Sequence, residues 1–160
     1  MVTHAPDDVE RPAVGRDPTY WSTFLLGAAV MAALDEIVFH QLLGWHHFYD
    51  AASLRIGLLS DGLLHAAELV ALVAGGFLLA DAHRRGLAVR AVAVAGFVTG
   101  LGAFQMWDGV VDHKVLRLHQ VRYGVDLLAY DAAWIGGGLL VLVVGLVLTA
   151  RAARRRRAEG

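Results

Sequence analysis

Apolar residues run along most of this chain in four long stretches, which short polar links separate. The stretches cover about residues 20–43, 58–80, 87–111 and 127–150. A hydrocarbon core about 30 Å thick requires roughly 20 residues of helix. Four segments cannot close a barrel, and an open sheet would leave backbone groups unpaired in lipid. The pattern therefore predicts an all-α membrane protein with four transmembrane helices.

The short links predict that consecutive helices pack antiparallel, as an up-down bundle. The transmembrane domain is expected to span residues 20–150. Residues 1–19 are polar and contain all three prolines of the chain. They predict a disordered tail rather than a signal peptide, because they lack an apolar core. Residues 151–160 form a second, basic tail.

Basic residues are distributed unevenly between the two ends of the predicted helices. Of the 14 Lys and Arg residues, ten lie in the two tails and around the second link, and four lie at the opposite end. Because basic flanks stay on the cytoplasmic side, both the N-terminus and the C-terminus are predicted to be cytoplasmic. The arginine run at 154–157 fits contact with anionic lipid headgroups.

The amino-acid composition limits the surroundings of the protein and the ligand types that it can offer to a metal ion. Apolar residues make up 57% of the chain and charged residues 18%, as expected for a protein whose solvent is the lipid bilayer. The net charge of −1 shows no excess of basic residues of the kind that binds nucleic acid. The chain has no cysteine, which excludes disulfides, thiolate metal sites and thiol nucleophiles. Any metal ion must therefore be held by nitrogen and oxygen ligands.

Histidines and carboxylates gather at the end opposite the basic residues, near the predicted outer face. Ionisable groups inside a membrane are costly, and they point to function. The candidate metal ligands are His40, His65, His113 and His119, then Asp61 and Asp108, and then Glu36, Glu68, His46, His47 and Asp112. On the second helix the candidates share one face, because they are spaced i, i+4 and i+7. Asp35 and His40 lie about 140° apart on an ideal helix, so Asp35 is expected to support a ligand rather than to be one.

An internal repeat relates the first helix to the third, with an offset of 73 residues (97 − 24). Phe24, Gly27, Asp35, His40 and His46 align with Phe97, Gly100, Asp108, His113 and His119. The shared pattern is F-x2-G-x7-D-x4-H-x5-H. We interpret it as an internal duplication of helices 1-2 as helices 3-4. Two parallel repeats would place His40 and His113 at equal depth across the bundle.

Imidazole and carboxylate ligands suit Fe, Cu(II), Zn or Mn. Helical bundles hold di-iron and di-manganese centres with this mixture of ligands. The sequence therefore predicts a mono- or dinuclear metal site near the outer face. Its role is open between redox chemistry, hydrolysis and delivery of metal to a partner, so whether the protein is an enzyme is open as well.

Two other functions fit the same residues. One is a b-type haem protein in which His40 and His113 are axial ligands, although flanking carboxylates would repel the haem propionates. The other is a non-catalytic assembly or scaffold subunit of a membrane complex, whose polar cap docks a partner. The G-x3-G spacing of Gly96 and Gly100 indicates a helix-packing face and leaves a homodimer open.

Three motifs carry a resemblance to a known family. They are DEIVFHQLLGWHH at residues 35–47, SDGLLH at 60–65 and GVVDHKVLRLHQV at 109–121. Through them the chain resembles, over about residues 20–150, a family of small four-helix bacterial membrane proteins known as domain of unknown function 2243. The resemblance implies the four-helix fold and a location in the bacterial plasma membrane, and it implies no activity. Lys114 and Gln120 depart from the motif, because each stands in place of the second histidine of a pair.

Overall fold

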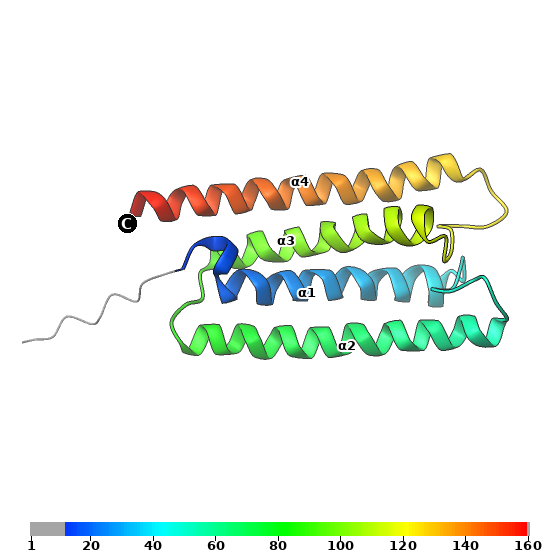
Figure 1. Cartoon of the computed structure of the whole chain (residues 1–160), viewed down its shortest axis with the longest axis horizontal. Helices are drawn as coiled ribbons and strands as arrows, with labels where there is room; N and C mark the ends of the chain where they lie inside the picture. The colour runs from blue at the N-terminus through cyan, green and yellow to red at the C-terminus, as the bar shows by residue number, and fades with distance from the viewer. Residues whose placement is uncertain (1–11, 160) are drawn as a thin grey trace, which may run out of the picture.

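A computed structural model gives the structure of residues 12–159, which form helices joined by loops and contain no strand (Figure 1). The helices are η1 (Val14–Arg16), α1 (Pro18–Asp35), η2 (Glu36–Leu42), α2 (Leu54–Arg84), α3 (Arg90–Trp107), η3 (Asp108–Val115) and α4 (Leu127–Glu159). Residues 1–11 of the predicted disordered tail lie outside the described residues. The helix α4 continues through most of the predicted basic tail.

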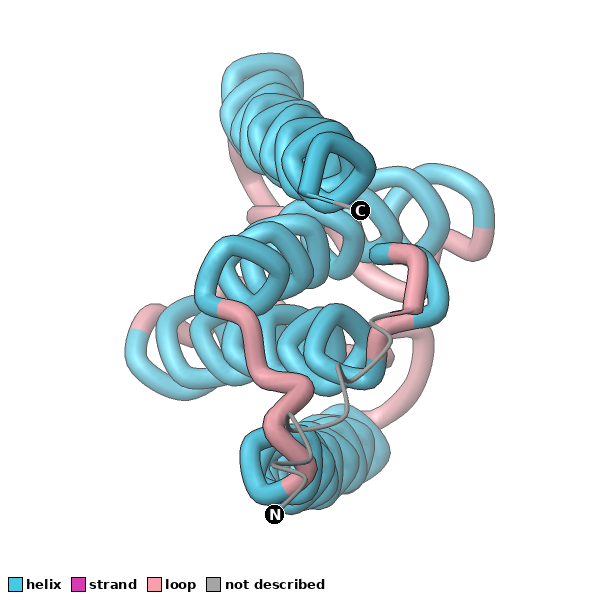
Figure 2. Tube along the Cα trace, turned by 90° about the vertical axis from the view of Figure 1, so that its left-hand side faces the viewer, coloured by secondary structure: helices cyan, strands magenta, loops and turns pink. Residues whose placement is uncertain are grey.

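The helices α1 and α3 form a central, parallel pair (Figures 1 and 2). The helix α2 packs antiparallel against α1, and α4 packs antiparallel against α3. The order across the bundle is therefore α2, α1, α3, α4, with the two central helices running in the same direction. The loops 43–53 and 116–126 both close the end of the bundle that lies away from the C-terminus, and we call this the loop end.

Three segments are long and apolar enough to cross a membrane, namely Pro18–Leu42, Leu54–Arg84 and Leu127–Ala158. Within the described residues, α3 does not reach the same hydropathy. It carries an arginine, a glutamine and three glycines, which lower its mean hydropathy, and it lies between α1 and α4. Three candidate spans are thus found, and a fourth crossing by α3 stays a prediction.

Glycines bring the two central helices into backbone contact. A Cβ atom on Gly27 would lie 2.0 Å from the carbonyl oxygen of Phe97, and one on Gly100 would lie 2.0 Å from that of Phe24. These four residues are the aligned residues of the sequence repeat, so each helix makes the same contact with the other. Gly96 likewise faces the backbone of α1. The glycine spacing is therefore used inside the chain, where small residues let helices approach closely.

Both central helices end in a π-helix, a rare form with i to i+5 hydrogen bonds that is frequent at functional sites. In η2, the N–H of Leu43 donates to the carbonyl of Val38 at 2.9 Å. In η3, the N–H of Leu116 donates to the carbonyl of Val111 at 2.7 Å. The two bonds again join residues that are 73 positions apart (111 − 38), so the two ends share one local geometry.

The second residue after each π-helical end has a left-handed backbone. Gly44 has φ +57°, and Arg117, at the matching position of the repeat, has φ +54°. Glycine adopts this conformation without steric cost, whereas a residue with a Cβ atom adopts it at a cost of about 1 kcal/mol or more. Arg117 is the one non-glycine residue with positive φ in the described part of the chain. Both loops therefore turn back over the bundle in the same way.

The predicted disordered tail is structured in its described part, residues 12–19. The carboxylate of Asp17 accepts a hydrogen bond from the N–H of Thr19 at 2.7 Å and so caps α1. The guanidinium of Arg156 on α4 reaches the same carboxylate at 2.8 Å. Asp17 is almost fully buried in this arrangement. The contact ties the segment before α1 to the far end of α4, which the polar composition of the segment did not indicate.

Substitution of Gly100 by alanine is expected to destabilise the bundle. The new methyl group would meet backbone atoms of α1, which cannot turn aside, and overpacking of this kind costs about 1–3 kcal/mol or more. Gly76 on α2 has open space around it, so Gly76→Ala is the matched control. Thermal unfolding in detergent should show a lower Tm for Gly100→Ala and an unchanged or higher Tm for Gly76→Ala. Equal Tm values would contradict the close approach of α1 and α3.

Candidate metal centre

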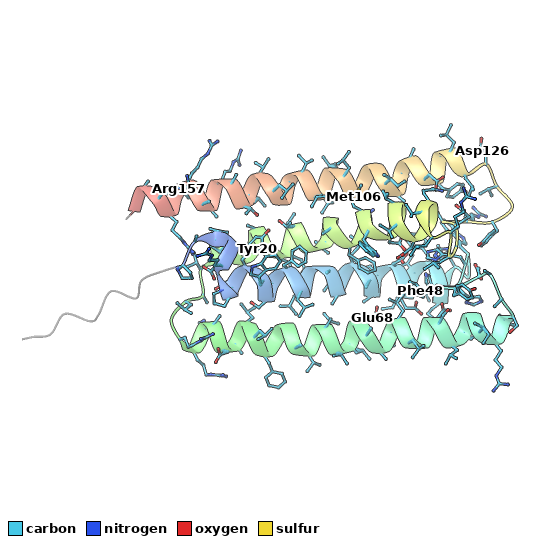
Figure 3. The ribbon with its side chains drawn as sticks, viewed as in Figure 1. Tyr20, Phe48, Glu68, Met106, Asp126 and Arg157 are labelled. Carbon is cyan, nitrogen blue, oxygen red and sulfur yellow. The ribbon has the colours of Figure 1, made fainter. Side chains whose placement is uncertain are left out.

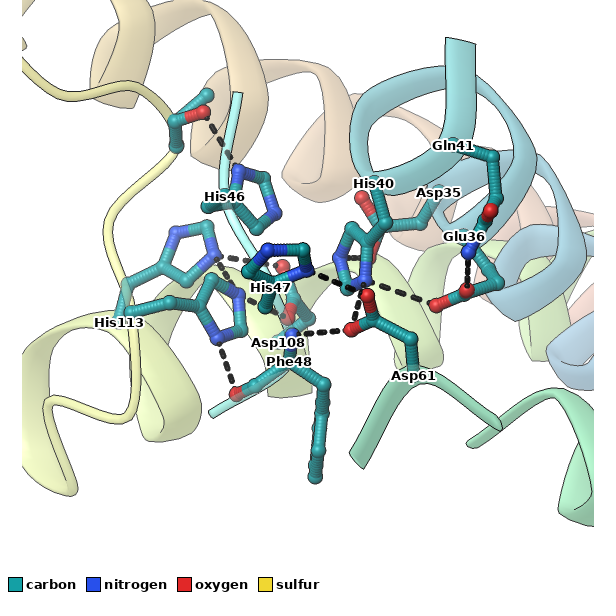
Figure 4. A network of polar contacts seen from close by, with 12 residues as sticks. Asp35, Glu36, His40, Gln41, His46, His47, Phe48, Asp61, Asp108 and His113 are labelled. Atoms are coloured by element: carbon teal, nitrogen blue, oxygen red, sulfur yellow. Dashed lines mark hydrogen bonds and ion pairs between the residues drawn. The ribbon is translucent and has the colours of Figure 1, made fainter. Parts of the chain in front are cut away.

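Four histidine side chains meet at the loop end of the bundle, and three of them are labelled in Figure 4. His40 comes from η2 and His113 from η3, while His46 and His119 come from the loops that follow. All four are buried, with exposures between 1% and 5%. The two loops close over the helix ends and remove the imidazoles from solvent, so groups from four segments share one enclosed region.

The rings of His46 and His119 are stacked at the middle of the cluster. Their centroids lie 4.5 Å apart with an interplanar angle of 6°. The ring of His40 meets that of His46 at 4.5 Å, and the ring of His113 meets that of His119 at 4.5 Å, both edge-on. The cluster thus has the same local two-fold arrangement as the glycine contact between the helices.

Each central histidine is oriented by the opposite loop. The Nδ1 atom of His46 lies 2.9 Å from the carbonyl oxygen of Val121, and the Nδ1 atom of His119 lies 2.9 Å from that of Phe48. A carbonyl oxygen only accepts, so each Nδ1 carries the hydrogen and each Nε2 keeps a free electron pair. This is how metal-binding histidines are usually held.

Burial, together with neighbouring histidines, lowers the pKa of His46 to about 2. Its imidazole is therefore neutral at physiological pH. A neutral ring with hydrogen on Nδ1 presents an unprotonated Nε2, which is the form that binds a metal ion.

His40 is held by carboxylates instead of a carbonyl group (Figure 4). Its Nδ1 atom lies 2.8 Å from Oε2 of Glu36 and 3.1 Å from Oδ1 of Asp61. The opposite ring atom, Nε2, then faces the other histidines. Within the described residues, the buried Nε2 atoms of His40 and His46 have no hydrogen-bond partner. Two unpaired nitrogen atoms at one buried point are expensive, unless an ion binds them.

The carboxylate oxygens of Asp108 lie beside the rings of His113 and His119. Its Oδ2 lies 3.1 Å from Nε2 of His113, and its Oδ1 lies 3.4 Å from Nε2 of His119. The two Nε2 atoms are 2.8 Å apart. Ligand atoms that share a tetrahedral ion at about 2.0–2.1 Å lie roughly 3.3 Å from one another. The three side chains thus stand at nearly the separation that one ion requires.

The potential ligand atoms fall into three overlapping groups. Within each group, the ligand atoms lie within 4.8 Å of one another. The groups are His40, His46 and His119; Asp108, His113 and His119; and Glu36, His40 and Asp61. All seven residues involved are predicted ligands, and all of them are buried. The described structure therefore contains a site that could hold a cation at the predicted height.

The carboxylates of this region lack lysine or arginine partners among the described ion pairs. Those of Asp35, Glu36, Asp61 and Asp108 pair with histidines alone, and each is at most 3% exposed. Lys114 pairs instead with Asp131, at 2.7 Å. Several buried negative charges without a permanent cation are costly, and a divalent ion would compensate them.

Asp35 faces the cluster, contrary to the expectation from an ideal helix. Its Oδ2 lies 3.7 Å from Nε2 of His40. A π-helix, with its i to i+5 hydrogen bonds, has more residues per turn than an α-helix, so residues five apart come closer to one face. The ideal-helix angle of about 140° does not apply here because the helix changes type after Asp35, and the supporting role of Asp35 stays a prediction.

The remaining predicted ligands lie around the cluster. His47 places its Nδ1 2.6 Å from Oδ2 of Asp61. Asp112 is buried in η3 but belongs to none of the three groups. His65 is half-exposed on α2 and contacts the buried carboxylate of Glu68, which lines an apolar groove between α1 and α2 (Figure 3). The structure brings neither His65 nor Glu68 into the groups of the cluster, and their role as ligands stays a prediction.

Sequence reasoning missed Trp134, whose Nε1–H donates to Oδ2 of Asp108 at 2.8 Å. Trp134 follows Asp61 by 73 residues, so the offset of the repeat could have found it. The two positions differ in chemistry, because the first half has a carboxylate where the second has an indole. Gly109 correspondingly stands in place of Glu36, and a Cβ atom there would touch Trp134 at 3.0 Å. The indole thus fills the space that the acidic side chains take in the first half.

The fold and the cluster define a helical membrane protein with buried histidine and carboxylate groups at one end of its bundle. The chain belongs to the family described as Predicted membrane protein (DUF2243), whose model matches residues 22–152. The resemblance drawn from the motifs is thereby confirmed. The description of the family names a membrane protein and no activity. No curated protein and no solved structure matches the chain.

Replacement of Asp61 by alanine is expected to destabilise the loop end. The side chain accepts from the backbone N–H of Phe48 at 2.7 Å and contacts the rings of His40 and His47. Each buried donor that loses its partner costs about 1–3 kcal/mol. Asp131→Ala is the control, because it removes a part-exposed ion pair worth about 1 kcal/mol or less. Unfolding in detergent should show the larger loss for Asp61→Ala, and equal losses would contradict this role.

Proposed function

We propose that the protein binds a divalent transition metal at the loop end of its bundle. The proposal rests on one observation, namely four buried imidazoles packed together beside carboxylates that have no lysine or arginine partner. The first-choice ligands are His40, His46, His113, His119 and Asp108. The Nδ1 atoms of His40, His46 and His119 each face an acceptor, which supports the use of Nε2 as the ligand atom.

The donor set narrows the choice of metal. Imidazole nitrogen and carboxylate oxygen suit Fe, Mn, Cu(II) and Zn, whereas a site without thiolate is a poor match for Cu(I). Such an ion, when bound, supplies Lewis-acid chemistry, and redox chemistry if it is Fe, Mn or Cu. The residues of the chain would orient the ligands, balance the charge and keep bulk water out.

Burial of the ligands favours some roles over others. The four histidines and Asp108 are each at most 5% exposed, so a large substrate could not contact an ion among them without movement of the loops. Electron transfer, chemistry on a very small molecule, or storage and delivery of the ion itself need no such access. We therefore favour a redox or metal-handling role over hydrolysis of a bulky substrate.

The haem alternative is less well supported by the packing of the rings. His46 and His119 lie between His40 and His113, each within about 4.5–6.2 Å of both of them. These rings take the space that a porphyrin would need between two axial ligands. The scaffold alternative is also weaker, because the polar side chains point toward one another rather than outward to a partner. An ion is the occupant that fits the arrangement.

We further propose that α3 crosses the membrane with the other three helices, which makes four crossings. Because basic residues gather at the end away from the loops, the loop end and the metal site would face the outside of a bacterial plasma membrane. Both termini would then be cytoplasmic.

An origin by duplication agrees with the sequence offset and with paired contacts in the two halves. The glycine contacts, the π-helical ends and the loop hydrogen bonds to His46 and His119 all recur at that offset.

Metal analysis tests the central proposal. Protein purified in detergent and exposed to Zn(II) or Co(II) should retain metal after desalting, and the His40→Ala/His113→Ala double variant should retain little, because both halves of the cluster lose a ligand. His83→Ala is the control, since this exposed histidine lies at the other end of α2. Equal metal content in the wild type and the double variant would refute the proposal.

Cysteine labelling tests the topology, because the chain has no cysteine of its own. Exposed residues in the three links are available, namely Ala51, Ala88 and Tyr123. A membrane-impermeant maleimide should label Ala51→Cys and Tyr123→Cys in intact cells, and Ala88→Cys only after lysis. If Tyr123→Cys behaves like Ala88→Cys, then α3 does not cross. If the whole pattern is reversed, the orientation is opposite.

A further inference from the structure

We infer that the centre holds two metal ions, one for each half of the chain, and that each ion is bound by one aspartate and two histidines. This inference rests on the proposed metal binding and adds the number of ions and the ligands of each. The first triad is Asp35, His40 and His46, and the second is Asp108, His113 and His119. Asp35 was not a ligand candidate from the sequence, and the structure is what places it beside His40.

The spacing D-x4-H-x5-H explains how one segment supplies three ligands. The π-helix brings the aspartate and the first histidine, five residues apart, onto one face. The left-handed residue that follows, Gly44 or Arg117, turns the chain back over the helix end. The second histidine then returns to the first, with their ring centroids 4.5 Å apart in both halves. Each copy of the motif therefore brings its two histidines together, with the aspartate 3.7 Å (Asp35) or 3.1 Å (Asp108) from the first histidine.

The two triads are related by the local two-fold arrangement of the whole loop end. The ring of His40 lies 5.9 Å from that of His119, and the ring of His46 lies 6.2 Å from that of His113. These cross-distances nearly match each other, and the ring distances within the two histidine pairs are equal, whereas Asp35 lies 3.7 Å from His40 and Asp108 lies 3.1 Å from His113. A single ion off the axis would use the two halves unequally, whereas each half contributes one aspartate and two histidines at the same spacing. Equal sets favour two adjoining ions.

The number of candidate ligands also indicates two ions. Four imidazoles and two carboxylates exceed the four ligands of a closed tetrahedral site. Divided in two, they make the combination of two histidines and one carboxylate that binds Fe(II) and related ions with positions left open. The buried, unpaired Nε2 atoms of His40 and His46 belong to the first triad, which gives that triad free donor atoms of its own.

The two ions would differ in affinity, because the surroundings of the triads differ. The Nδ1 atom of His40 faces the carboxylates of Glu36 and Asp61, which strengthen the ring as a donor. The Nδ1 atom of His113 is buried and has no hydrogen-bond partner within the described residues. Trp134 also donates a hydrogen bond to Asp108, the carboxylate of the second triad. The first triad should therefore bind its ion more tightly.

Metal stoichiometry tests the inference on the full chain in detergent. After Co(II) loading and desalting, elemental analysis should give two ions per chain for the wild type and for the His83→Ala control. Asp35→Asn and His40→Ala should each remove one ion, and so should Asp108→Asn and His113→Ala. The asparagine variants keep side-chain volume, so they report on ligands even if an alanine variant fails to fold.

The outcomes separate this inference from the proposed function. One ion per wild-type chain, lost in both asparagine variants, would overturn the two-ion arrangement and leave metal binding intact. No ion in the wild type would refute both. Asp61→Asn supplies a further check, because it should weaken binding of the tighter ion by about tenfold or more and leave the weaker ion unchanged. Equal weakening of both ions would contradict separate triads.

Discussion

The backbone contact between α1 and α3 is the constraint on which the rest of the molecule depends. Gly27 and Gly100 let each helix touch the main chain of the other, so the axial register of the pair has no freedom. Because the helices are parallel, their final turns reach the same depth. Two π-helical ends and two loops then meet face to face. A side chain at either glycine would separate the elements that carry the histidines.

Burial of charged groups is the second constraint, and it is the reason that the loop end is the candidate functional site. Carboxylates and imidazoles are packed together and buried, and among the described ion pairs these carboxylates have no lysine or arginine partner. Soluble proteins avoid such clusters unless a cation or a chain of hydrogen bonds stabilises them. Here the hydrogen bonds from opposite loops hold His46 and His119 with their free nitrogens inward. The same contacts that close the loops therefore orient the two imidazoles.

The two halves of the chain share one backbone arrangement and differ in the residues that contact His40 and His113. Glu36 and Asp61 support His40, whereas Gly109 and Trp134 stand at the matching positions beside His113. A repeated frame with unequal support is a way to obtain two neighbouring sites of different strength from one motif. Membership of a family of membrane proteins places this arrangement in a protein of the bilayer.

The sequence by itself determined the helical class, the approximate helix positions, the end at which polar residues gather and the spacing of the repeat. These properties follow from local hydrophobicity and periodicity, which each segment carries alone. Only the tertiary structure decided that α2 and α4 flank a parallel central pair, that Asp35 faces His40, and that His65 stays outside the cluster. Ring orientation depends on the contacts of His46 and His119 with carbonyl groups of the opposite loops, and no single segment contains both partners.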